Sequence, residues 1–156
     1  SIGEIAIKSQ SNMKGYWRNE KATEECMNEE GWFKSGDLGK FDGPFLYILD
    51  RLKDMVIRGG ENIACPEVEG AIYEHPDVLE ASVFGIPDER LGEILCTAIY
   101  LREDSETSED DIRVFLSDKL AAFKIPAVIN FSIEPLPKLA SGKFDKPTLR
   151  GIFENK

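Results

Sequence analysis

Three short stretches of the chain contain residues whose chemistry could serve a function: a lysine, a carboxylate and a pair of glycines. Lys143 ends the Pro-, Ser- and Gly-containing stretch at residues 136–143, and stretches of this composition form exposed, mobile loops. Asp37 follows Trp-Phe-Lys-Ser-Gly, and Gly59 and Gly60 are adjacent. Taken singly, each has an ordinary explanation: a solvated lysine, a turn carboxylate and a glycine turn.

The glycine pair lies in the stretch around which the rest of the chain is arranged, residues 50–69. Residues 55–57 are apolar and predict a strand, residues 58–62 predict a turn that tolerates positive φ, and Ile63 resumes the extended chain. Pro66 suits the first turn of a helix, because its missing N–H would be unpaired there anyway. The order is therefore strand, turn, strand, helix.

Before this stretch, residues 2–8 alternate between apolar and polar types and predict a strand, which needs partner strands to be stable. Residues 42–44 read Asp-Gly-Pro and indicate a turn, and the apolar residues 45–49 predict a second strand.

After this stretch, strands are predicted at residues 78–84 and 94–101 with a loop at 85–92 between them, and a further strand at 128–133. Ser108 and Asp111 predict a capped helix start. The helix that follows has an apolar stripe of core residues: Ile112, Phe115, Leu116 and Leu120. Pro147 opens a last helix with three apolar residues on one side: Leu149, Ile152 and Phe153.

These elements predict a small α+β or α/β-like domain of two or three layers, with a two-stranded hairpin and a mixed three-stranded sheet packed with helices. The length of 156 residues allows one main core, and 42% hydrophobic with 31% charged residues is ordinary for a globular protein. The net charge of −10 argues against nucleic acid or an anionic membrane as partner, because both attract basic surfaces.

Three cysteines, Cys26, Cys65 and Cys96, have no C-x-x-C spacing, so we expect neither a disulfide framework nor a zinc site. This favours a reducing cytoplasm. No apolar run approaches the roughly 20 residues that span a bilayer, so no transmembrane segment is expected. The first residues have no signal-peptide character, and we expect the start to be cut from a longer chain.

The combination of motifs resembles a known family. Residues 51–69 read R-x-K-D-x-V-x-x-G-G-E-N-I-x-x-x-E-V-E, residues 32–37 read W-F-K-S-G-D, and residues 136–143 read L-P-K-L-A-S-G-K. In this order and at these distances they resemble the adenylate-forming enzymes: acyl-CoA synthetases, luciferases and peptide-synthetase adenylation domains. The resemblance implies that residues 1–51 end the large N-terminal domain and that residues 52–156 form the small C-terminal lid domain.

The resemblance also implies roles for individual residues. Asp37 and Arg51 match the pair that binds the ribose of the nucleotide, and Lys53 matches the hinge about which the lid rotates. Lys143 matches the lysine that reaches the α-phosphate and the attacking carboxylate during adenylation. A fixed ammonium between two anions stabilises the charge that accumulates as they combine.

For coenzyme A (CoA), the resemblance implies contacts at Gly59 and Gly60, where the absence of side chains leaves space for pantetheine, and at Phe123 and Lys124 beside the CoA nucleotide. For Phe123 and Lys124 an aromatic ring under a turn with a solvated lysine explains the sequence equally well. Ile125 and Ala127 stand where some members carry basic residues that meet the CoA phosphates, so CoA contacts here would be weaker or differently arranged.

The implied activity is that of an acyl-CoA synthetase, with ATP, a carboxylic acid and CoA as substrates, AMP as a product, and Mg²⁺ held by residues outside this chain. The chain alone would be inactive, because the phosphate loop and the acyl pocket of the family lie upstream of it. Two alternatives remain: an adenylation domain that loads a carrier protein, and a non-catalytic interaction domain. A homodimer through the exposed N-terminal segment is also considered.

Overall fold

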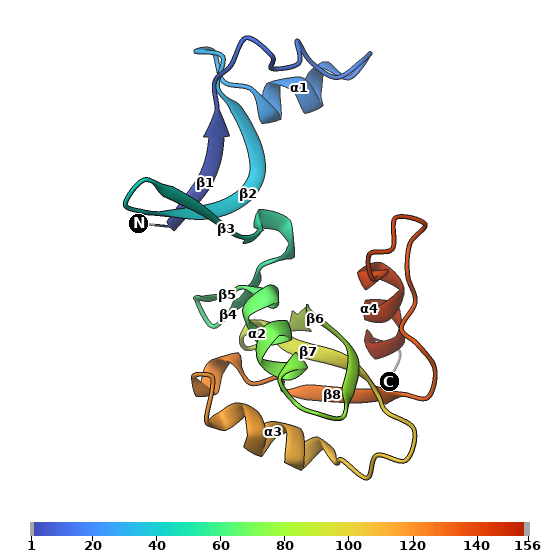
Figure 1. The fold of residues 1–156 in the computed structure, drawn as a ribbon. Helices are drawn as coiled ribbons and strands as arrows, with labels where there is room; N and C mark the ends of the chain where they lie inside the picture. Colours follow the sequence, from blue (N-terminus) through green and yellow to red (C-terminus); the bar gives the residue numbers. More distant parts are fainter. Residues whose placement is uncertain (1, 155–156) are drawn as a thin grey trace. The chain divides into compact units, whose positions relative to one another are not determined.

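The computed structural model describes residues 2–154 and divides the chain into two compact units, Ser1–Lys53 and Asp54–Lys156 (Figure 1). These are called the first and second unit below. The assignment of the two parts of the chain to the end of a larger domain and to a lid, with a border after residue 51, stays a prediction.

The first unit contains one helix and a three-stranded antiparallel sheet in the order β1-β2-β3. Its elements are β1 (Ile2–Ile7), α1 (Glu20–Cys26), β2 (Phe33–Asp42) and β3 (Phe45–Arg51). The predicted strands at residues 2–8 and 45–49 are confirmed, with β3 two residues longer. The partner that β1 requires is β2, which pairs with it from Ile2 opposite Lys40 to Ile7 opposite Phe33.

Strand β2 was not predicted, because its sequence contains two glycines and no regular alternation of apolar and polar residues. Its conformation comes from backbone pairing with β1 on one side and β3 on the other. Tertiary pairing thus overrides a weak local preference.

The second unit combines a hairpin, a mixed sheet and three α-helices (Figure 1). After the 3₁₀ turn η1 (Leu52–Asp54), its elements are β4 (Val56–Arg58), β5 (Glu61–Ile63), α2 (Cys65–Tyr73), β6 (Val78–Asp88), β7 (Gly92–Leu101), α3 (Glu109–Ser117), η2 (Ala122–Lys124), β8 (Val128–Ser132) and α4 (Lys146–Glu154). Strands β6 and β7 are antiparallel, β8 is parallel to β7, and the β4–β5 hairpin joins β7 where Arg58 pairs with Gly92. The predicted α+β class, with a hairpin and a mixed three-stranded sheet, is confirmed.

Helices cover both faces of this sheet, which gives three layers. Alternate residues of β6 and β7 point to opposite faces, as expected for strands. One face packs against α2 and α3 in a core that includes Val83, Leu95, Ile72 and Ile112. The other face packs against α4, where the rings of Phe84 and Phe153 meet edge-on with 5.0 Å between centroids.

Two local predictions about this unit are wrong. The predicted loop at residues 85–92 is mostly strand, because pairing continues from Gly85 opposite Leu95 to Asp88 opposite Gly92. The Asp88 carboxylate accepts hydrogen bonds from two backbone N–H groups in the short turn and closes it. Ile152 does not share the buried side of α4, since 46% of it is exposed whereas Leu149 and Phe153 are buried.

The predicted helix starts are confirmed. Ser108 and Asp111 form a capping box at the start of α3, where each side chain accepts a hydrogen bond from the other residue's backbone N–H. Pro66 lies in the first turn of α2. Both signals depend only on neighbouring residues, which is why the sequence reveals them.

Candidate functional site

Asp37 and Arg51 lie opposite each other on the antiparallel strands β2 and β3. The Arg51 Nε is 3.1 Å from the Asp37 Oδ1, an ion pair between a half-exposed guanidinium and a mostly buried carboxylate. No described residue donates a hydrogen bond to the second carboxylate oxygen of Asp37. The structure therefore brings together the two residues that are predicted to bind a ribose. Their binding of a ribose stays a prediction.

Lys53 lies in the 3₁₀ turn η1, at the border between the two compact units. Its side chain is exposed. A hinge requires only a few residues at such a border that can absorb a change in φ and ψ.

Gly59 and Gly60 form the two-residue turn of the β4–β5 hairpin, with φ of +59° and +88°. Both values are in the left-handed region that glycine tolerates best. A Cβ on Gly59 would lie 3.3 Å from a Leu91 methyl carbon, whereas a Cβ on Gly60 would meet nothing within 4 Å. The Gly59 N–H donates to the Leu91 carbonyl at 2.7 Å, so the turn is attached to the sheet.

The hairpin is also attached to the turn η2, which contains the other two residues predicted to contact CoA. The Arg58 Nη1 donates to the Phe123 carbonyl at 3.0 Å. The Lys124 ammonium donates to both carboxylate oxygens of Glu67, at 2.5 and 2.7 Å, and lies 5.8 Å from the centre of the Phe123 ring. Gly59, Gly60, Phe123 and Lys124 thus belong to one connected surface, called the hairpin site below.

Two residues of the hairpin site were missed by the sequence analysis. Arg58 joins the hairpin to η2, and its Nε is buried with no hydrogen-bond partner among the described residues. Glu67 neutralises Lys124, so that this ammonium is already engaged. The position of Arg58 beside Gly59 is a local signal, but nothing in the sequence pairs Glu67 with a lysine 57 residues away.

Lys143 lies in the segment between β8 and α4, called the Lys143 loop (residues 136–146) below. This loop is itself a narrow hairpin: the Leu139 N–H donates to the Lys143 carbonyl at 2.8 Å, and Lys138 pairs with Phe144. Gly142, with φ of +82°, forms part of its tip. The Lys143 side chain is exposed, and its ammonium forms no ion pair with any residue in the described part of the chain.

The Lys143 loop and the hairpin site lie on different sides of the second unit. In Figure 1 the loop precedes α4 at the right of the unit, and the β4–β5 hairpin is at its left. The two candidate sites are therefore separate parts of the surface of this unit.

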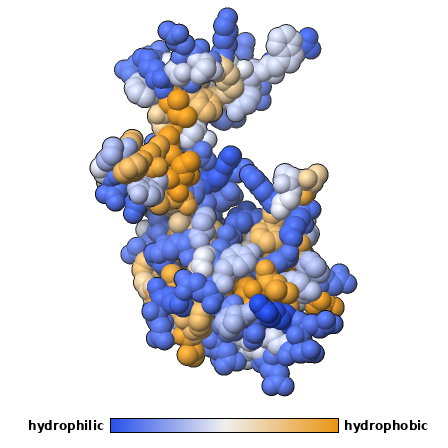
Figure 2. Space-filling model, viewed as in Figure 1, coloured by the Kyte–Doolittle hydropathy of each residue, from blue (hydrophilic) through white to orange (hydrophobic). Residues whose placement is uncertain are grey.

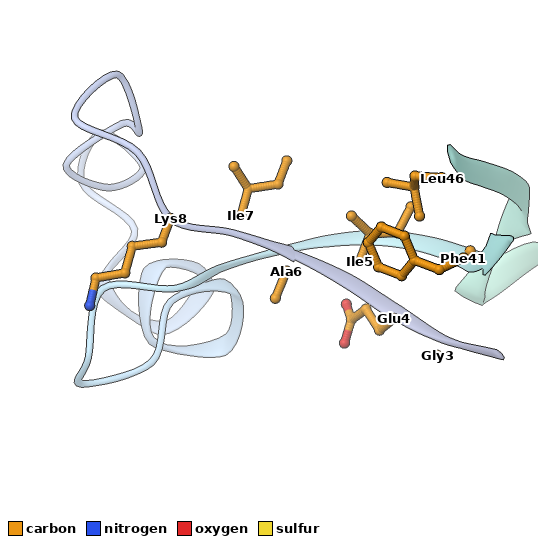
Figure 3. A pocket seen from close by; sticks show the side chains of 9 residues that line it. Gly3, Glu4, Ile5, Ala6, Ile7, Lys8, Phe41 and Leu46 are labelled. Atoms are coloured by element: carbon orange, nitrogen blue, oxygen red, sulfur yellow. The ribbon is translucent and has the colours of Figure 1, made fainter. Parts of the chain in front are cut away.

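Besides Asp37 and Arg51, the first unit has an exposed apolar surface on its sheet. Figure 2 shows apolar side chains gathered on its sheet, where the exposed large residues include Phe41, Phe45 and Ile48. A hollow of about 450 Å³ on this sheet is lined mainly by β1 residues with Phe41 and Leu46 (Figure 3). The lining of this hollow contains one carboxylate, that of Glu4, which belongs to none of the sequence motifs.

Within residues 2–154, no group of three His, Cys, Asp or Glu side chains is arranged to hold a metal ion. No helix in the same range is both long and apolar enough to cross a membrane.

Comparison with known proteins agrees with these motifs. Residues 67–143 match the family described as the AMP-binding enzyme C-terminal domain. The chain is 40% identical over 150 residues to a mitochondrial medium-chain acyl-CoA ligase of Danio rerio, covering 95% of this chain and 24% of that protein. It is 42% identical over 149 residues to the long-chain-fatty-acid–CoA ligase FadD13 of Mycobacterium tuberculosis, covering 95% of this chain and 29% of that protein.

Solved structures give the same result. ATP-bound MatB from Rhodopseudomonas palustris superposes with a TM-score of 0.91 at 34% identity, covering 99% of this chain and 31% of that chain. The chain thus spans about a quarter of the length of the first curated relatives that it matches.

Proposed function

Because this chain belongs to the AMP-binding enzymes and carries their C-terminal domain, we propose that it is the C-terminal part of an acyl-CoA synthetase. The proposed enzyme converts a carboxylic acid, ATP and CoA into an acyl-CoA, AMP and pyrophosphate. The observation that carries the proposal is Lys143: an exposed ammonium without an ion-pair partner in the described chain, presented on a narrow hairpin.

In the first half-reaction, a carboxylate oxygen of the acid attacks the α-phosphorus of ATP, and the bond to the leaving pyrophosphate breaks. Two anions meet in this step, so the charge that develops needs a fixed cation. Lys143 supplies it, because its ammonium has no carboxylate in the described chain to neutralise it. Asp37 accepts hydrogen bonds from the ribose hydroxyls, and Arg51 holds this carboxylate in place at 3.1 Å.

In the second half-reaction, the thiol of CoA attacks the acyl carbonyl, a thioester forms, and AMP leaves with the bonding electron pair. The hairpin site serves this step in our proposal, since Gly59 and Gly60 present backbone without side chains to a narrow pantetheine group. Because the Lys143 loop and the hairpin site lie on different sides of the second unit, the two steps require two orientations of that unit. Lys53 is the proposed hinge.

Magnesium accompanies ATP in the proposed reaction, and the described residues contain no cluster that fits it. We therefore assign no step to a metal within this chain. The family resemblance implies that the magnesium ligands, the phosphate loop and the acyl pocket lie outside the chain, so the isolated chain is expected to be inactive.

A carrier protein is the second candidate acceptor, and two observations favour it. The only lysine of the predicted CoA nucleotide contact, Lys124, is engaged by Glu67 at 2.5 Å. Ile125 and Ala127 offer no charge for the CoA phosphates. Thioester formation on CoA and on a phosphopantetheine-bearing carrier, measured with the same adenylate, decides between the two acceptors.

A role in fatty acid metabolism, a cytoplasmic location and a homodimer are further proposals. Related ligases are named as mitochondrial in Danio rerio and as peroxisomal in Petunia hybrida, so the compartment varies among relatives.

The test replaces Lys143 by Ala in the full-length protein. We expect adenylation, followed as pyrophosphate release, to slow about 10²- to 10³-fold, the loss typical of one preorganised charge-stabilising donor. Thioester formation from supplied acyl-adenylate and CoA should change less than about twofold. Lys119→Ala, which removes a lysine from the same unit, is the control and should leave both rates unchanged. Equal slowing of both steps by Lys143→Ala would show that this lysine is structural or serves both steps.

A further inference from the structure

Two carboxylates hold the Lys143 loop at its two ends, and the sequence analysis assigned a role to neither. They are Glu80 on β6 and Glu69 on α2. Their side chains are mostly buried, with 17% and 20% of their surface exposed. Mostly buried carboxylates require partners, and both find them on the loop.

Glu80 holds the segment that enters the loop. One of its carboxylate oxygens accepts the Leu136 N–H at 2.7 Å, and the other accepts the Lys138 ammonium. Leu136 itself is buried against the face of the sheet that α4 covers. The position of residues 136–138 is thus fixed by one apolar contact and two hydrogen bonds.

Glu69 holds the other end of the loop, where α4 begins. Its Oε1 lies 3.2 Å from the Lys146 ammonium and also accepts the Val83 N–H at 2.8 Å. Strand β6 pairs with β7 on one side only, so Val83 is on a sheet edge that Glu69 covers. Lys146 is therefore attached to the edge of the sheet through a carboxylate that cannot move freely.

We propose that Glu80 and Glu69 are positioning residues for Lys143. This inference rests on the proposed function. The Lys143 ammonium has no ion-pair partner in the described chain, so the direction in which it projects depends on the loop backbone. The loop narrows to a turn between Leu139 and Lys143, and its two ends are held to β6 and α2 by the two carboxylates. Loosening either end moves the tip of the loop.

The experiment uses the full-length protein with Glu80→Gln, which keeps the size of the side chain and an acceptor for the Leu136 N–H but loses the charge that attracts Lys138. The matched control is Glu74→Gln, because Glu74 forms the same kind of pair with Lys119 on a different part of the unit. Lys138→Met breaks the same pair from the other side and keeps the inference testable if Glu80→Gln does not fold.

We expect Glu80→Gln to lower kcat for adenylation about 10- to 100-fold, since a misplacement of about 1 Å can slow a reaction about 10²-fold. KM for ATP and the rate of thioester formation from supplied adenylate should change less than about twofold, because neither depends on the direction of Lys143. Amide hydrogen exchange at residues 139–143 should accelerate in Glu80→Gln and not in Glu74→Gln.

The outcomes separate this inference from the proposed function. If Lys143→Ala slows adenylation but Glu80→Gln and Lys138→Met behave like Glu74→Gln, Glu80 does not position Lys143, and the inference that both ends of the loop must be held is wrong. The same conclusion follows if Glu80→Gln slows both half-reactions equally. If Lys143→Ala leaves adenylation unchanged, the proposed function fails, and the inference fails with it.

Discussion

Replacing Gly60 by Ala tests whether the hairpin site serves the thioester step. Gly60 has φ of +88°, and a Cβ built there meets nothing within 4 Å. The added methyl group therefore causes no clash within the chain, and its only internal cost is the backbone conformation, about 1–2 kcal/mol for an L-residue at positive φ. We expect the full-length variant to remain folded, with its free energy of unfolding lowered by about that amount.

The effect on the reaction should be larger and confined to one step. If pantetheine passes beside Gly60, a methyl group in that narrow space costs about 1–3 kcal/mol, as for overpacking in a well-packed site. This corresponds to thioester formation that is about 5- to 150-fold slower. Adenylation should stay within about twofold of the unchanged protein. The assay supplies purified acyl-adenylate and CoA for the second step and follows pyrophosphate release for the first.

Gly142→Ala is a matched control for the free-energy cost of placing an L-residue at positive φ. Gly142 has φ of +82°, and its Cβ would also meet nothing within 4 Å, but it lies in the Lys143 loop. We expect it to affect adenylation and to leave thioester formation unchanged. The reasoning is refuted if Gly60→Ala slows thioester formation no more than Gly142→Ala does, or if it slows both half-reactions equally.

Three further predictions concern the hinge, the pH dependence of stability and the cysteines. Lys53→Pro, which fixes φ near −65°, should impair thioester formation in the full-length protein much more than adenylation; equal losses would argue against a hinge. Hydrogen bonds from the Thr107 hydroxyl and a neighbouring serine lower the pKa of Asp77 below 3.8, so its stabilising contribution is present above that pH and is lost as pH falls through the folded pKa. Urea unfolding of Asp77→Asn should therefore show lower stability than the unchanged protein at pH 7 and a shrinking difference below about pH 3.8. Burial raises the pKa of the Cys96 thiol to about 12, so thiol labelling of the native protein at pH 8 should modify Cys26 and spare Cys96 until the chain is unfolded.

The sequence by itself determined the features that depend on neighbouring residues. The capping box of Ser108 and Asp111, the proline at the start of α2 and the Gly59-Gly60 hairpin all involve groups within a few residues of one another. Such signals act through local backbone geometry and local hydrogen bonds, and they do not depend on the rest of the fold. The motifs that indicate the family are of the same kind, since each is a short run of residues.

The tertiary structure decided the features that join distant residues. Strand β2 exists because two other strands pair with it, and Ile152 is exposed because α4 buries only a narrow side against β6. The pair of Glu67 with Lys124 and the bond from Arg58 to Phe123 span 57 and 65 residues. No periodicity or composition of one segment specifies such contacts, because they depend on which faces meet when the sheet and helices pack.

The Lys143 loop shows the division most clearly. Its Pro-, Ser- and Gly-containing sequence predicts an exposed loop, and the family motif identifies the lysine at its end. In our proposal the direction of the loop is set by Glu80 and Glu69. Glu80 is 58 residues from Lys138 in the sequence, and Glu69 is also far from Lys146. Nothing in the sequence connects either carboxylate with the loop, although Glu69 ends the motif at residues 51–69, and only the folded sheet edge brings them to the two ends of the loop.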